Sequence, residues 1–71
     1  MQRFLDDIEA LVNETVDMGN LACEMIEKSV QAIVDGNVEL ADEVINDFGR
    51  MDRYDNEIEE AAIRILTIYQ P

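Results

Sequence analysis

The sequence contains no histidine, no tryptophan and a single cysteine, Cys23. Without histidine it cannot build a Ser-His-Asp or Cys-His catalytic group, or a zinc site of nitrogen and sulfur ligands. A single cysteine excludes an internal disulfide, which favours a reducing compartment such as the cytoplasm. Carboxylates are the main chemical resource left, and no nucleophile or acid/base pair stands out among them. The sequence therefore argues against an enzyme.

Basic residues are also scarce, because 5 lysines and arginines stand against 17 aspartates and glutamates, for a net charge of −12. That balance excludes a nucleic-acid-binding surface and disfavours adhesion to anionic lipid. Apolar runs fall short of the roughly 20 residues of a membrane span, and the N-terminus lacks signal-peptide features. We therefore expect a cytoplasmic protein with no direct membrane insertion, whose partners are cations or basic protein surfaces.

Turn-forming residues are few, and they are informative at Asp35-Gly36-Asn37. Glycine adopts the left-handed conformation that ends a helix, and asparagine is a good N-cap for the next one. So short a connection makes the flanking helices antiparallel neighbours. The sequence predicts one all-α domain over residues 1–71, with helices over about 3–34 and 38–70 and a turn at 35–37.

Each predicted helix carries a stripe of residues at steps of three and four, which is typical of an amphipathic helix. The first stripe comprises Phe4, Ile8, Leu11, Thr15, Met18, Ala22, Met25, Ser29 and Ile33, and the second Ala41, Val44, Phe48, Met51, Asp55, Ile58, Ala62, Ile65 and Tyr69. Two helices alone cannot enclose both stripes, and 71 residues are few for an independent core. We therefore predict a homo-oligomer, most simply two hairpins in a four-helix bundle.

Asp55 occupies the second stripe where an apolar residue is expected, and Asp52 precedes it on the same side of the helix. A carboxylate in such a place must be paired, hydrated or bound to a cation. One interpretation is a metal site formed by Asp52 and Asp55, and the other is a polar residue that sets helix register. Asp47 with Arg50, and Arg53 with Glu57, are predicted to form ordinary surface ion pairs.

The order of these segments resembles the PhoU family of phosphate-uptake regulators. Asp17–Ala22 is similar to a Met-Gly segment in the first helix of that family. Leu40–Ile45 is similar to the segment that follows its turn, and Met51–Ala61 to its acidic second helix. Gln70-Pro71 is similar to the dipeptide that introduces a third helix there, and the resemblance covers roughly Leu11 to Pro71.

The resemblance implies a three-helix repeat, normally present twice, in a cytoplasmic negative regulator of phosphate uptake. It also implies association with the phosphate transporter's ATPase and with a sensor histidine kinase. Family members bind metal clusters through acid-x-x-x-Asp motifs on the second and third helices, which implies a divalent or iron cation. Asp52 matches the final aspartate of the second-helix motif, whereas Phe48 stands where the family has its first carboxylate.

These observations predict a non-enzymatic regulator or adaptor of phosphate uptake and signalling that acts by protein–protein contact. One alternative is a metal-binding helical bundle that collects carboxylates from several chains. The other is a structural oligomerisation module, or a truncated regulator whose chain lacks a third helix.

Overall fold

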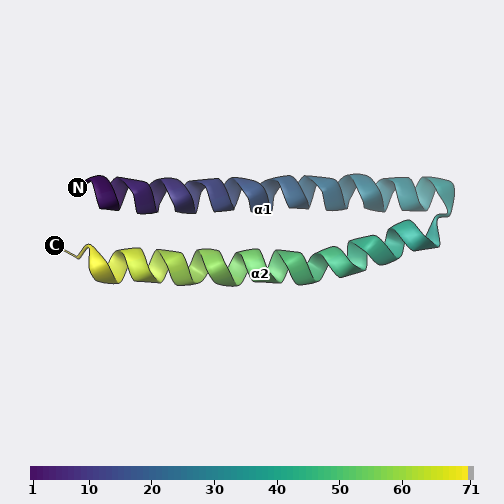
Figure 1. The fold of residues 1–71 in the computed structure, drawn as a ribbon. Coiled ribbons are helices and arrows are strands. Elements are labelled where there is room, and N and C mark those ends of the chain that lie inside the picture. Colours follow the sequence, from purple (N-terminus) through teal and green to yellow (C-terminus); the bar gives the residue numbers. More distant parts are fainter. Residues whose placement is uncertain (71) are drawn as a thin grey trace.

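The computed structural model describes residues 1–70, which form two long α-helices. Helix α1 runs from Gln2 to Asp35 and α2 from Val38 to Ile68, side by side and antiparallel (Figure 1). The molecule is a rod with extents of 54 × 16 × 13 Å. The described residues contain no strand, so the prediction of an all-α helical hairpin is confirmed.

The turn between the helices has the conformation that its residues dictate. Gly36 lies in the left-handed region, with φ 62° and ψ 34°, and its N–H bonds to the carbonyl of Ala32. Asn37 also donates its N–H to Ala32, over 2.9 Å. Its side-chain oxygen then accepts from the N–H of Leu40 at 3.1 Å, which caps α2. These bonds satisfy helix-end groups that a reversal of the chain would otherwise leave unpaired.

The free end of the hairpin is also fastened. The rings of Phe4 and Tyr69 meet edge to face, with centroids 4.9 Å apart, and the Tyr69 hydroxyl donates to Asp7 at 2.6 Å. We expected the second helix to reach residue 70, but α2 ends at Ile68. Tyr69, anchored to α1 by these contacts, has left the helical conformation at φ −104° and ψ 27°. The predicted role of Pro71 in starting another helix lies outside the described residues.

The buried contact between α1 and α2, here called the hairpin interface, is centred on Leu21, Met25 and Val44. Met51 and Tyr54 pack against this centre, and Ala61 and Ile65 continue it toward the free end. Together with Asp47 and Ile58, the residues on α2 repeat at alternating steps of three and four, the spacing of long antiparallel helices. Leu21 is the most completely buried of them, at 3% exposure.

The predicted stripes coincide only in part with the hairpin interface. They share Met25, Val44, Met51 and Ile65 with the hairpin interface, but they also included Ala22, Phe48 and Asp55. The structure instead places the residues one position earlier between the helices. Leu21 and Asp47 are buried there, and Tyr54 is half-buried. On each helix, apolar side chains lie on both sides of the shared residues, so spacing alone does not decide which of the two sides faces the other helix.

Candidate functional site: an open apolar face

The row of stripe residues that includes Ala22, Phe48 and Asp55 lies on one open side of the hairpin. We call this side the open apolar face. By helical spacing it comprises Ile8, Val12, Thr15, Ala22, Ile26, Ser29 and Ile33 from α1, and Val38, Ala41, Ile45, Phe48, Asp52, Asp55, Glu59, Ala62 and Leu66 from α2. Most of its large apolar side chains are more than half exposed. An apolar surface of this length is typical of an interaction site.

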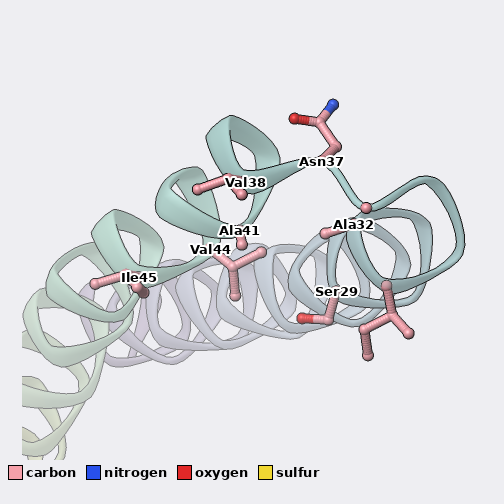
Figure 2. A pocket seen from close by; sticks show the side chains of 9 residues that line it. Ser29, Ala32, Asn37, Val38, Ala41, Val44 and Ile45 are labelled. Carbon is pink, nitrogen blue, oxygen red and sulfur yellow. The ribbon is translucent and has the colours of Figure 1, made fainter.

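Near the turn, the face is hollowed between the two helices (Figure 2). Ala32 and Val44 form the floor, while Val38 and Ile45 project along its α2 edge. The hollow has a volume of about 470 Å³. Ile45 is 64% exposed although its neighbour Val44 is buried, so the sequence presents apolar side chains both to the hairpin interface and to solvent.

A second hollow continues the face toward the middle of the rod. It is lined from α1 by Ala22, Ile26 and Ser29, and from α2 by Phe48 and Met51. Phe48 is 57% exposed. The floor of this hollow is formed by the same Met25 and Val44 that centre the hairpin interface. A third hollow, between Ile8 and Leu66, extends the face to the free end.

Asp52 and Asp55, the predicted metal ligands, lie along this face and are exposed. Among residues 1–70, neither carboxylate takes part in a described ion pair or hydrogen bond, and no group of three potential metal ligands converges. With Phe48 in place of another carboxylate, the described residues do not complete a cation site. Metal binding by Asp52 and Asp55 stays a prediction that requires ligands from another helix or chain.

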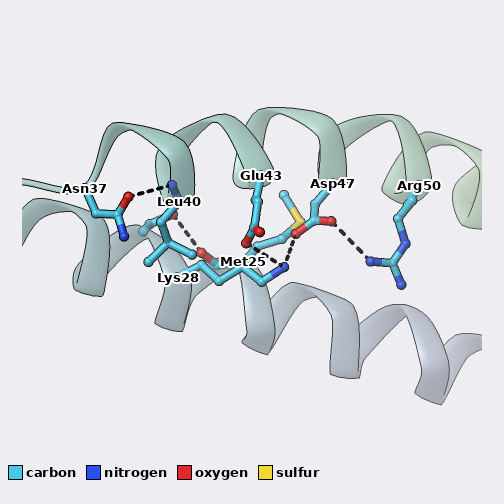
Figure 3. A network of polar contacts seen from close by, with 8 residues as sticks. Met25, Lys28, Asn37, Leu40, Glu43, Asp47 and Arg50 are labelled. Atoms are coloured by element: carbon cyan, nitrogen blue, oxygen red, sulfur yellow. Dashed lines mark hydrogen bonds and ion pairs between the residues drawn. The ribbon is translucent and has the colours of Figure 1, made fainter.

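The opposite side of the hairpin is polar and closed by side-chain contacts (Figure 3). Asp47 is only 5% exposed, and one of its carboxylate oxygens accepts from the Lys28 ammonium at 3.1 Å. Its other oxygen accepts from Arg50 at 3.1 Å, and Lys28 also lies 3.9 Å from Glu43. The hydrogen bond from Lys28, helped by Arg50, holds the pKa of Asp47 below its usual value despite the opposing effect of burial.

The prediction of an ordinary surface pair between Asp47 and Arg50 was thus half correct. The pair exists, but its carboxylate is buried in the hairpin interface and its main partner is Lys28 on α1. Sequence reasoning missed Lys28 because it paired charges along one helix only. Lys28 and Asp47 stand at similar distances on either side of Gly36, a signal that an antiparallel hairpin brings them together. The predicted pair of Arg53 with Glu57 is not formed in the described residues.

Two further carboxylates meet across the helices on the polar side. Glu14 of α1 faces Glu57 of α2, and a hydrogen bond between the two carboxyl groups, with burial and mutual repulsion, raises the pKa of Glu14. The hydrogen bond from Tyr69 to Asp7 raises the pKa of the tyrosine hydroxyl. These contacts position the helices, and none of them supplies a nucleophile with an adjacent base.

The fold and the open apolar face define a helical hairpin with one long, exposed apolar side. Comparison with known sequences gives the family. Residues 15–71 match the model of the PhoU domain, so the chain belongs to the PhoU family.

Two curated relatives match all or nearly all of this chain. It is 33% identical over 69 residues to the phosphate-specific transport system accessory protein PhoU homolog of Aquifex aeolicus (strain VF5), covering 97% of this chain and 31% of that protein. It is 34% identical over 71 residues to the homolog of the same name in Rhizobium meliloti (strain 1021), covering 100% of this chain and 30% of that protein. The chain thus spans about a third of these relatives. No solved structure gives a significant match.

Within residues 1–70, neither helix combines the length and the apolar character needed to cross a membrane.

Proposed function

We propose that this chain is a non-enzymatic regulator of phosphate uptake that acts in the cytoplasm by binding other proteins. The relatives are accessory proteins of phosphate-specific transport systems, which supports the biological setting. The proposed mode of action is based on the open apolar face, which runs from the turn to the free end of the hairpin. A surface of this kind gains free energy when it is covered by another apolar surface.

The components of the phosphate transport system are the natural partners for such a face. By family resemblance, the transporter's ATPase and a sensor kinase are the proposed ones. A regulator of this type needs no catalytic group of its own, because covering or releasing a surface on its partner changes the partner's activity. The charge of −12 adds long-range attraction toward a partner with a basic surface.

A pair of matched variants at the natural gene tests this function. Ile26→Asp with Phe48→Asp places two carboxylates in the middle hollow, whereas Asn20→Asp with Asn46→Asp adds the same charge at exposed positions away from that face. The readout is a reporter gene induced by phosphate starvation, measured in phosphate-rich medium. We expect the Ile26 and Phe48 variant to lose repression and the Asn20 and Asn46 variant to keep it.

Circular dichroism of both purified chains is the control for folding. Normal repression by a folded Ile26→Asp, Phe48→Asp variant would refute a regulatory role for the face. The alternative function, a metal-binding bundle, predicts instead that a divalent cation raises the melting temperature and that Asp52→Asn with Asp55→Asn abolishes this effect. A purely structural oligomerisation module predicts that neither variant affects the reporter.

A further inference from the structure

The polar side of the hairpin has a hollow next to the ion pairs of Asp47, on the side toward the free end. It is lined by Arg50, Arg53, Tyr54 and Glu57 of α2 and has a volume of about 210 Å³. Helical spacing places these side chains on one flank of α2, away from the open apolar face. At about 30 Å³ for each molecule of liquid water, the hollow holds about seven waters. A tetrahedral oxyanion therefore fits there with water beside it.

Several hydrogen-bond donors in this hollow are not used by the protein itself. Arg50 donates from one terminal nitrogen to Asp47 at 3.1 Å, and the rest of its guanidinium makes no described contact (Figure 3). Within residues 1–70, Arg53 takes part in no described ion pair or hydrogen bond, and neither does the hydroxyl of the half-buried Tyr54. A guanidinium offers several donors and no acceptor. The lining therefore suits a ligand that accepts hydrogen bonds, and the fork of a guanidinium matches the oxygens of an oxyanion.

Glu57 adds a carboxylate to the same lining, and this limits which oxyanion fits. It shares a hydrogen bond with Glu14 of α1, but a carboxylate has two oxygens with several lone pairs, so acceptor capacity is left. This carboxylate repels an anion that has no hydroxyl group. From an anion with a hydroxyl group, it accepts a charge-assisted hydrogen bond. The hollow thus favours oxyanions that carry a proton.

Inorganic phosphate meets both requirements near neutral pH, because each of its ions there keeps at least one P–OH group. Sulfate has accepting oxygens but is fully ionised and has no hydroxyl group. A phosphate monoester has a second pKa of about 6, so above pH 7 it is mostly a dianion without a hydroxyl group. The arrangement of donors and acceptor therefore distinguishes free phosphate from both of these anions.

We propose that this hollow binds inorganic phosphate. The two arginines and Tyr54 donate to the phosphate oxygens, and Glu57 accepts from the phosphate hydroxyl group. The site lies on the side opposite the open apolar face, so its ligand goes beyond the proposed function and does not depend on it.

The charge of the chain sets the strength of this binding. A net charge of −12 opposes the approach of any anion, and Asp47 already engages part of the charge of Arg50. At physiological ionic strength, exposed charges more than about 8 Å apart are largely screened. The two guanidiniums in contact with the anion therefore decide whether it binds, and the distant carboxylates lower its affinity. We expect a dissociation constant on the order of 1 mM.

Nuclear magnetic resonance titration of the 71-residue chain tests the proposal. Sodium phosphate is added at pH 7.5 while sodium chloride keeps the ionic strength constant, and the readout is the backbone amide signals of 50–57 and the side-chain N–H signals of the arginines. We expect saturating shifts confined to these signals. Sulfate and methyl phosphate, titrated in the same way, should bind at least about fivefold more weakly, since neither donates to Glu57.

Three variants separate a specific site from general screening of an acidic chain. Arg53→Gln should weaken phosphate binding about tenfold, as the loss of a charge-assisted contact requires. Arg64→Gln removes the same charge from another exposed position of α2 and should weaken it less than about twofold. Glu57→Gln should abolish the preference for phosphate over sulfate, because an amide can donate to either ion. Circular dichroism checks that each variant is folded.

Several results would overturn the phosphate site. Shifts of equal size and midpoint for phosphate and sulfate would show that the hollow does not recognise the hydroxyl group. Equal losses in the Arg53 and Arg64 variants, or shifts that grow without saturating, would show general screening. An unchanged preference in Glu57→Gln would remove the role of the carboxylate. None of these results bears on the open apolar face, whose reporter measurement succeeds or fails separately.

Discussion

The difference between the hairpin interface and the open apolar face predicts opposite outcomes for two substitutions five residues apart on α1. Leu21 is 3% exposed and Ile26 is 65% exposed. Replacing each by alanine removes a similar amount of apolar side chain. If the face is open in solution, only the first substitution should reduce the free energy of unfolding substantially.

The expected size follows from burial. Replacing a buried leucine by alanine costs about 2–5 kcal/mol, and least where the surroundings can collapse into the space. In a hairpin that is only two helices thick they can, so we expect about 2–3 kcal/mol for Leu21→Ala. Ile26 has about a third of its surface covered, so Ile26→Ala loses under about 1 kcal/mol of burial. The better helix propensity of alanine returns a few tenths of a kcal/mol, for a net change within about 0.5 kcal/mol.

Urea unfolding followed by circular dichroism at 222 nm measures both changes, and it should be repeated over a hundredfold range of protein concentration. A chain of this size has a total stability of only a few kcal/mol, so Leu21→Ala should remove a large part of it. Equal losses for the two variants, with midpoints that rise with concentration, would show that a second copy covers the face. That result would refute our division of the hairpin into one buried and one open side.

Two further substitutions test individual features of the helices. Glu14→Gln should raise the melting temperature at pH 7. Because the pKa of Glu14 is raised in the folded chain, wild-type stability should increase as the pH falls from neutral toward the ordinary glutamate value, and the variant should lose this dependence in pH-resolved thermal melts. Gly49→Ala should stabilise α2 by about 0.5–1 kcal/mol in urea unfolding, since an added methyl group would meet no atom within 4 Å. A destabilised Gly49→Ala variant would mean that another molecule packs closely there.

The turn could be predicted from sequence because its determinants are local. Gly36 supplies the positive φ and Asn37 supplies the cap, and neither depends on what the helices do further along. The residues that the predicted stripes share with the hairpin interface could also be predicted, because they are apolar and regularly spaced. Local chemistry and periodicity were therefore sufficient for the hairpin itself.

The facing of each helix could not be predicted in the same way. Asp47 lies three residues after Val44, and Asp55 lies four residues after Met51, so each carboxylate is one helical turn from an apolar residue of the hairpin interface. The sequence pattern alone does not distinguish the two aspartates. What distinguishes them is Lys28, which lies on the other helix and reaches Asp47 only in the folded register. An individual helix pattern carries no information about that cross-helix partner, so it could not show that Asp47 is buried between the helices while Asp55 is exposed.

The buried ion pair and the open face are two consequences of one arrangement. Lys28 and Arg50 satisfy Asp47 only if the flank that carries Asp47 turns toward α1, and this rotation directs the flank with Phe48 and Asp55 to the other side. Sliding one helix past the other would leave the Asp47 carboxylate buried and unpaired, which is costly. The polar network thus selects the rotation that leaves an apolar side exposed. It stabilises a hairpin whose largest remaining source of binding free energy faces outward.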